Sequence, residues 1–311
     1  MQTTARSKNA HRTSIGTRIK KDWQLYLFVA LPVAYFIVFH YLPLYGVQIA
    51  FKNYKLAKGI AGSPWVGFKN FEKFFSSYSC TRMIMNTLLL NFYGLLVDFP
   101  IPIFLALLLN RLVNPKFKKF TQTVIYIPHF ISTVVMAGML YIMLDTNGII
   151  NVFIKAMGGE PIQFMAEASW FRTIYIASGE WQNAGWNTIL YLATLTAIDP
   201  EIYEAATIDG ATIRQKIWHI DVPYVIPIAM MMLILNSGKM LGGDTTKALL
   251  LQTSGNTAAS DIIGVYVYNI GLTQGQFSYT AAIGLFQNLI SLIMVLTVNT
   301  ISKKVSDISM F

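Results

Sequence analysis

Residues 203–211 read YEAATIDGA, and residues 221–223 read DVP. This short polar and acidic stretch separates two long apolar segments of the chain. Charged side chains are costly inside a bilayer, so a stretch of this kind between apolar segments is expected to face water. We therefore interpret this stretch as an exposed segment, called the handle below, that a partner protein binds. Movement of the partner would be transmitted through the handle to the rest of the chain.

The composition predicts a membrane protein. Of the 311 residues, 54% are hydrophobic and only 13% are charged, whereas about a quarter of the residues in soluble domains are charged. The single cysteine, Cys80, excludes an intramolecular disulfide and a multi-cysteine metal site. The net charge of +9 flanks apolar segments instead of forming one stripe, so nucleic-acid binding is not expected. His40, His129 and His219 lack the spacing of metal ligands, and no metal site is predicted.

Six apolar segments are long enough to cross a bilayer. They lie at about Trp23–Pro43, Ile84–Leu109, Thr121–Leu144, Arg172–Ile198, Pro223–Leu241 and Tyr279–Ser302. The first has no small-residue cleavage site and is too long for a signal-peptide core, so it is predicted to remain uncleaved. We therefore expect an all-α membrane protein with six transmembrane helices and with both termini on the same side.

The distribution of Lys and Arg predicts the orientation. If the N-terminus is inside, fourteen of the 24 basic residues are inside, and the tail 1–22 and the loop after the second span carry most of the weight. We expect residues 1–22 and 303–311 to be cytoplasmic tails and residues 44–82 to be an external loop. Within that loop, four phenylalanines at helical spacing predict a short helix that either lies along the membrane interface or packs on the protein's own spans: Phe68, Phe71, Phe74 and Phe75.

The handle carries the signals of two short helices. Asp199 is a predicted N-cap, with Pro200 at the first helical position. This helix is expected to end near Asp209, where Gly210 permits a left-handed turn.

A capping box of Thr212 and Gln215 predicts the second helix, which should end at about Ile220, before Pro223 starts the next span. The net charge of the handle is −3, from Asp199, Glu201, Glu204, Asp209 and Asp221 against Arg214 and Lys216. Other inside segments are basic, so this patch indicates docking to a basic groove of a soluble partner. An ordinary solvated loop is the alternative.

Parts of the sequence resemble a known family. The residues Glu204-Ala205-Ala206, Asp209-Gly210-Ala211, Ile217, Ile220 and Pro223 resemble the "EAA" signature of permease subunits in binding-protein-dependent ABC importers. Val222 stands where that pattern usually has leucine. Residues 66–71 (VGFKNF) resemble a loop of the sugar-importer permeases. Residues 41–46 (YLPLYG), 108–110 (LLN) and 126–130 (YIPHF) resemble the branch for complex oligosaccharides and polysaccharide fragments.

The resemblance implies a type I ABC importer permease fold, with a core at 84–302 and a coupling helix at about 199–221. It also implies partners: a second homologous permease, a cytosolic ATPase dimer that binds ATP and Mg, and an extracellular solute-binding lipoprotein, all at a bacterial cell membrane. No Gly-rich phosphate loop occurs in this chain, so no cofactor is expected in this subunit. The residues expected to contact the ATPase are Glu204, Ala205, Ala206, Ile208, Asp209, Gly210 and Ile217.

Polar residues within the spans predict a substrate path. In the fourth span, Glu180, Asn183, Asn187 and Tyr191 follow one helical stripe, with Trp181 and Trp186 beside it. Carboxamides and indoles suit a sugar, which offers hydroxyls and apolar CH faces, although packing between helices is a competing explanation. Residues of other spans that are expected to face the same cavity are Asn86, Asn91, Asp98, Asn236, Gln287 and Asn288.

The sequence therefore predicts a non-enzymatic transport subunit that moves oligosaccharide from an external binding protein to the cytoplasm. Three alternatives remain. The chain could be an importer permease for an amino acid or phosphonate, an ion-coupled secondary transporter, or a membrane scaffold. Secondary transporters usually show more spans and internal repeats, which are not evident here. A scaffold would need the handle but not the polar stripe.

Overall fold

The computed structural model describes residues 21–306, so most of the predicted tails at 1–22 and 303–311 lies outside the described residues, and residues 303–306 belong to the last helix. This part of the chain is helical and contains no strand beyond one isolated bridge between Lys52 and Trp65. The α-helices are α2 (Trp23–Phe36), α3 (Gly59–Gly62), α4 (Lys69–Phe75), α5 (Cys80–Asp98), α6 (Pro100–Asn110), α7 (Pro115–Tyr126), α8 (Thr133–Met143), α9 (Ile149–Ala156), α10 (Ala168–Thr196), α11 (Pro200–Ile208), α12 (Ile213–Lys216), α13 (Val222–Ser237), α14 (Thr245–Leu251), α15 (Thr257–Ser260), α16 (Ile263–Tyr268) and α17 (Phe277–Ser306).

Four helices in this part of the chain are long and apolar enough to cross a membrane: Trp23–Phe51, Cys80–Asn110, Ile213–Ser237 and Phe277–Lys304. The pair Pro115–Phe130 and Thr133–Met143 counts as a fifth if its two halves form one span. The predicted fourth span is α10, whose 29 residues reach about 44 Å at 1.5 Å per residue. α10 is not among these apolar helices, because it carries many polar side chains. The number of six transmembrane helices therefore remains a prediction.

The third predicted span, Thr121–Leu144, is broken, and this corrects the prediction of one helix. The chain bends by 96° between Phe130 and Thr133. Pro128 lies in the last, 3₁₀-type turn before the bend, and its ring and missing N–H disfavour a regular helix there. Ser132 then starts α8 as an N-cap by accepting a hydrogen bond from the Val135 amide.

Two predicted helix ends are also wrong, and each lies beside a proline. The first span continues beyond Pro43 to Phe51, through a π-helical turn at Ile37–Tyr41 and a 3₁₀ helix at Leu42–Phe51. The second handle helix does not end near Ile220, because a π-helical turn at Ile217–Asp221 joins α12 to α13. A wide turn before a proline changes the local hydrogen-bond pattern, so the missing N–H does not terminate the helix.

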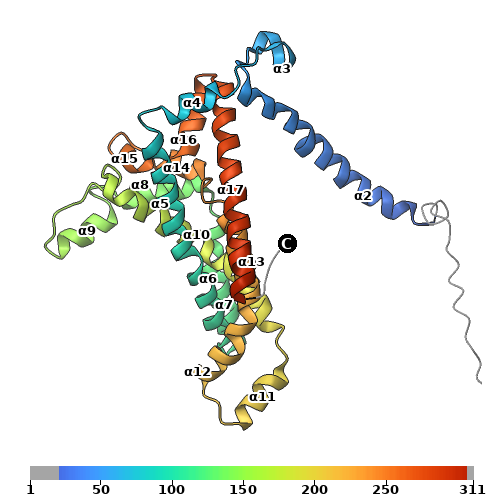
Figure 1. The fold of residues 1–311 in the computed structure, drawn as a ribbon. Coiled ribbons are helices and arrows are strands. Elements are labelled where there is room, and N and C mark those ends of the chain that lie inside the picture. Colours follow the sequence, from blue (N-terminus) through green and yellow to red (C-terminus); the bar gives the residue numbers. More distant parts are fainter. Residues whose placement is uncertain (1–20, 307–311) are drawn as a thin grey trace, which may run out of the picture.

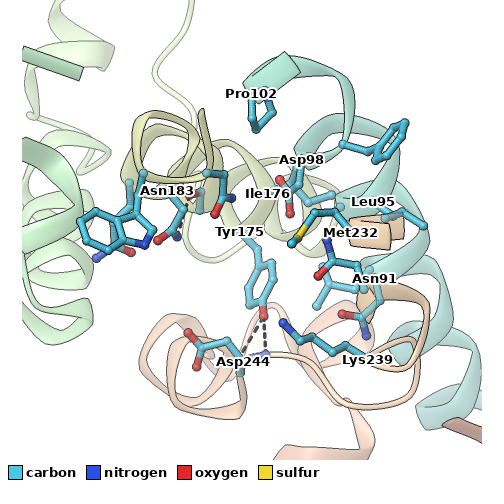
Figure 2. Close-up of a pocket in the computed structure, with 18 of the residues that line it drawn as sticks. Asn91, Leu95, Asp98, Pro102, Tyr175, Ile176, Asn183, Met232, Lys239 and Asp244 are labelled. Atoms are coloured by element: carbon cyan, nitrogen blue, oxygen red, sulfur yellow. Dashed lines mark hydrogen bonds between the residues drawn. The ribbon is translucent and has the colours of Figure 1, made fainter. Parts of the chain in front are cut away.

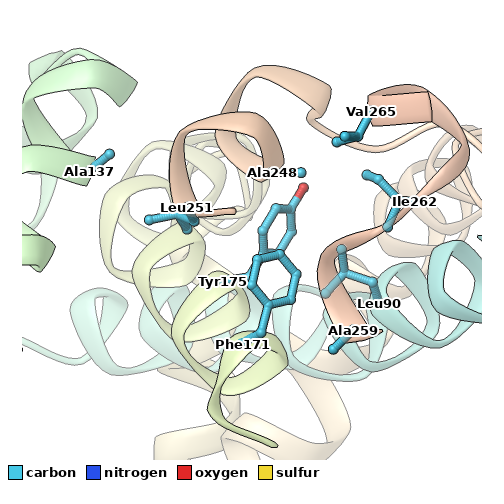
Figure 3. Packing of buried hydrophobic residues seen from close by; sticks show 9 residues of the cluster. All are labelled: Leu90, Ala137, Phe171, Tyr175, Ala248, Leu251, Ala259, Ile262 and Val265. Atoms are coloured by element: carbon cyan, nitrogen blue, oxygen red, sulfur yellow. The ribbon is translucent and has the colours of Figure 1, made fainter. Parts of the chain in front are cut away.

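The helical body has α10 near its centre, while α2 extends away from it (Figure 1). The handle helices α11 and α12 lie at one end of the body, and α3 and α4 lie at the other (Figure 1). One buried cluster joins Phe171 and Tyr175 of α10 to the α14–α16 region (Figure 3). In α4, Phe74 is buried and its ring lies 6.0 Å from that of Phe286 in α17, so this helix packs on the protein's own spans.

Close packing of α10 on α7 depends on Gly185. A Cβ atom at this position would lie 2.0 Å from the carbonyl oxygen of Ile125, closer than atoms can approach without a shift of the backbone. We expect Gly185→Ala to destabilise the protein by about 1–3 kcal/mol, the usual cost of overpacking. The melting temperature of the detergent-purified chain should fall by about 2–4 °C per kcal/mol.

The matched control is Gly284→Ala in α17, where an added Cβ would meet no atom within 4 Å. If the two variants melt at the same temperature, the close approach of α7 and α10 is not present in the protein.

Candidate functional site

A cavity of about 600 Å³ lies between α5, α6, α10, α13 and the segment that follows α13 (Figure 2). Its polar wall is formed mainly by amides and by ionisable groups, and its aromatic wall by Tyr175, Trp186 and Tyr191. The polar lining residues are Asn91, Asp98, Gln182, Asn183, Asn187, Asn236, Lys239, Asp244 and Lys247.

The cavity brings together five of the nine residues that the sequence predicts for the substrate path: Asn91, Asn183, Trp186, Asn187 and Tyr191. Asp98 and Asn236, which were expected on the same wall, also line it.

The other four predicted substrate-path residues do not line this cavity. Glu180 is buried and does not line the cavity, although its carboxyl group lies close to that of Asp98, which does. Trp181 is half exposed and does not line the cavity. Gln287 donates a hydrogen bond to the Leu241 carbonyl at 2.6 Å and lines a second cavity of about 400 Å³, whereas Asn288 is exposed on α17. Asn86 is buried and donates to the carbonyls of Ala258 and Asp261.

Asn183, His129 and Trp186 support one another at the cavity wall. Nδ1 of His129 lies 3.0 Å from Oδ1 of Asn183, and the His129 ring stacks on the Trp186 indole at 4.4 Å between centroids and 8° between planes. The stack holds one indole face against the imidazole. Sequence reasoning missed His129, although it lies directly after Pro128 in an interrupted span, where a polar side chain is a signal for function.

A backbone carbonyl at the break in the third span receives a hydrogen bond from a side chain of α10. Nε2 of Gln182 donates to the carbonyl oxygen of Ile131 at 2.6 Å, within the bend. Irregular backbone at membrane depth requires such a partner because lipid offers none. Gln182 therefore anchors the element that carries His129.

Asn91 holds the loop between α13 and α14. Its Nδ2 donates to the Met240 carbonyl at 3.1 Å and to the Thr87 carbonyl at 2.8 Å. Gly243 in this loop has φ +93°, a conformation that favours glycine, and a Cβ there would also make a tight contact of 3.2 Å with Oδ1 of Asn91. The loop between α13 and α14 thus forms one edge of the cavity, through Lys239, Met240 and Asp244.

Ionisable groups from the α13–α14 region complete the wall. Lys247 is buried, donates from Nζ to the Tyr175 carbonyl and lies 4.4 Å from the centre of the Tyr175 ring. The Tyr175 hydroxyl donates to the Asp244 carbonyl at 3.2 Å and accepts from the Asp244 amide at 3.1 Å (Figure 2). The sequence analysis did not select Lys239, Asp244 or Lys247, because no periodic pattern marks them.

The formal charges of the lining cancel, since two lysines face two aspartates. Amides that donate and accept, together with an exposed indole, suit a polar ligand with many hydroxyl groups. Among residues 21–306 no cluster of three or more His, Cys, Asp and Glu has the arrangement of a metal site.

The handle has the predicted local geometry. Oδ1 of Asp199 accepts from the Glu201 amide at 3.0 Å, and α11 runs from Pro200 to Ile208. Gly210 has φ +77°, and Thr212 and Gln215 form a complete capping box. Both N-caps and the glycine stop are therefore confirmed.

The handle residues that are predicted to contact the ATPase differ in their exposure. Glu204, Ala205, Ile208, Asp209 and Gly210 are exposed, while Ala206 and Ile217 are half-buried. The predicted charge needs a correction, because Asp221 is fully buried in an ion pair with Arg111. The other charged residues of the handle leave four acidic against two basic groups, a net of −2.

Residues 99–307 match the family described as "Binding-protein-dependent transport system inner membrane component". The chain is similar to the polygalacturonan/rhamnogalacturonan transport system permease protein YteP of Bacillus subtilis, with 40% identity over 96% of this chain and 94% of that protein. It is also similar to the arabinooligosaccharides transport system permease protein AraP of Bacillus subtilis, with 31% identity over 90% and 88%.

Solved structures give the same result for the fold. A chain in the crystal structure of a bacterial ABC transporter involved in the import of the acidic polysaccharide alginate aligns with a TM-score of 0.86 and 35% identity, over 94% of this chain and 99% of that one. A second structure of the alginate transporter, in complex with a periplasmic protein that holds an alginate pentasaccharide, gives 0.86 and 34% over 95% and 99%.

Proposed function

Since this chain belongs to the family of binding-protein-dependent transport system inner membrane components, we propose that it is the permease subunit of an ATP-driven importer of oligosaccharides. The observation that carries the proposal is the cavity, which amides of three helices line together with the exposed Trp186 indole. The amides suit hydroxyl groups, and the indole suits the CH face of a pyranose. The names of the relatives, which mention polygalacturonan, rhamnogalacturonan and the acidic polysaccharide alginate, support a saccharide substrate.

The proposed subunit works with three partners: a second homologous permease, a cytosolic ATPase dimer and an external solute-binding protein. None of the apolar window of the first span is buried inside this chain, which supports a second subunit or lipid around it. The exposed Ile208 and Glu204 of α11 suit a cleft with an apolar floor and a basic rim. In this proposal ATP and Mg bind only to the ATPase, and this subunit performs no covalent chemistry.

The proposed location is the bacterial cell membrane, with the handle and both termini on the cytoplasmic side. The handle lies at the opposite end of the body from α4 (Figure 1), which supports assigning the 44–82 loop to the external face. The orientation also follows from the excess of Lys and Arg in the segments assigned to the inside.

The complete transporter in liposomes should take up an oligosaccharide only when ATP is inside and the binding protein is outside. The test panel is an oligogalacturonide, an alginate pentasaccharide, an arabino-oligosaccharide, an amino acid and a phosphonate. We expect saccharide uptake to persist when an ionophore collapses the ion gradients, because ATP hydrolysis drives the cycle. Uptake that needs an ion gradient instead of ATP would establish a secondary transporter, and uptake of the amino acid or phosphonate alone would exclude the saccharide assignment.

A further inference from the structure

Apart from the backbone at its two ends, α11 is joined to the helical body mainly through one side chain, Tyr203. Within residues 21–306, the side-chain hydrogen bonds and ring contacts that lead out of α11 are those of Tyr203, apart from the bond between Lys216 and Thr207 inside the handle. Tyr203 also packs against the buried cluster that includes Leu109 and Ile198. The other α11 side chains are exposed, except for half-buried Ala206. A force applied to α11 therefore has one main side-chain route into the helical body.

The side chain of Tyr203 contacts a buried ion pair between Arg111 and Asp221. Its hydroxyl donates to Oδ1 of Asp221 at 2.5 Å, and the other carboxylate oxygen accepts from a guanidinium nitrogen of Arg111. The guanidinium carbon lies 5.2 Å from the centre of the Tyr203 ring, within cation–π range. Asp221 is fully buried, so both of its donors are needed to offset the loss of water around the carboxylate.

The Tyr203 hydroxyl remains a donor under cytoplasmic conditions. Burial, and then the hydrogen bond to Asp221, raise the pKa of Tyr203 to about 12. The phenol is therefore protonated near neutral pH, and its bond to the carboxylate is not lost by ionisation.

The three residues come from different segments. Arg111 directly follows α6, Tyr203 lies in α11, and Asp221 ends the π-helical turn before α13. The α5–α6 helix also carries Asn91, Asp98 and Pro102 of the cavity wall, so Arg111 stands at one end of a helix whose other part contacts the cavity.

We propose that Arg111, Tyr203 and Asp221 form a clamp that transmits the movement of α11 to the α5–α6 helix and so to the cavity. The clamp rests on the proposed function, because it is useful only if a partner moves α11. Its members are positioning residues, which do not touch the substrate. The alternative is a static contact that holds the handle in shape without carrying movement.

The test uses the complete transporter in liposomes, with the saccharide that wild type transports best. Tyr203→Phe keeps the ring and removes the hydroxyl, and Arg111→Gln with Asp221→Asn keeps a polar pair without charge. We expect both variants to retain the ATPase dimer at wild-type yield and to hydrolyse ATP. The number of saccharides transported per ATP should fall about 10-fold or more, because the movement of α11 is then no longer transmitted to the α5–α6 helix.

Arg82→Gln with Asp261→Asn is the matched control, since it makes the same charge changes in an ion pair of 3.1 Å outside the handle. It should leave the ratio of transport to hydrolysis unchanged. A wild-type ratio in both clamp variants would overturn the clamp. Loss of ATPase binding in Tyr203→Phe would also overturn it, because the contact would then shape the docking surface. Failure of the proposed function is distinct, since the wild-type transporter itself would then show no ATP-driven saccharide uptake.

Discussion

Glu204→Lys should abolish substrate uptake while the chain still inserts into the membrane. Glu204 is exposed on α11, and no ion pair holds it among the residues that the structure describes. In the proposed complex it meets a basic residue of the ATPase cleft, so lysine would replace an attraction by a repulsion. Disrupting a desolvated charge pair costs about 2–5 kcal/mol, so we expect ATPase affinity to fall at least about 30-fold. Co-purification of the ATPase with the permease measures this directly.

The matched control for this variant is Glu160→Lys, which makes the same charge change at an exposed position in the segment between α9 and α10. It should bind the ATPase and transport like wild type. Glu204→Gln should show an intermediate loss, because it removes the attraction without adding repulsion. Wild-type uptake by Glu204→Lys would show that α11 is not the coupling element.

Features of the handle that depend on near neighbours were predictable from sequence. The Asp199 cap, the capping box of Thr212 and Gln215 and the turn at Gly210 each involve residues within a few positions of one another. The state of Asp221 was not predictable in this way. Its partner Arg111 is 110 residues earlier, so a residue counted as part of an acidic surface is in fact buried.

The same distinction explains the third span. Pro128 and Ser132 are visible in the sequence as a weak point in a helix, yet they do not show that the helix bends by 96°. The bend is supported by Gln182, whose amide reaches Ile131 from 51 residues away. Helical patterns give the length of an apolar segment, whereas a distant side chain decides whether it can be broken.

The candidate cavity was partly predictable because helical periodicity places residues on one face. Asn183, Asn187 and Tyr191 were selected on that basis, and all three line the cavity. Glu180 belongs to the same stripe and lies close to Asp98 of the cavity wall, but it is buried and does not line the cavity. Periodicity gives the direction of a side chain but not whether neighbouring side chains cover it. Lys239 and Asp244 lie in irregular backbone, where no pattern gives even the direction.

The variant with Trp186→Ala and Asn187→Leu should assemble normally and transport poorly. Both side chains are exposed at the cavity wall, so their removal leaves no buried cavity in the fold. The alanine removes an indole face on which a sugar ring can stack, and the leucine removes an amide that can donate and accept. Together these losses are worth about 1.4 kcal/mol or more, which is a fall in uptake of about 10-fold. The measurement is initial uptake by liposomes that contain equal amounts of the complete transporter.

Trp181→Ala is the informative control, because Trp181 is on the same helix and equally exposed but does not line the cavity. Loss of an indole from α10 in general would affect both variants, whereas loss of a substrate contact should affect only the cavity variant. Trp186→Ala and Asn187→Leu should also be measured singly, since the effects of adjacent residues need not add. If the double variant transports like wild type, the stripe serves helix packing and the path lies elsewhere. If uptake falls in the double variant but not in Trp181→Ala, and ATPase binding is intact in both, the cavity wall contacts the substrate.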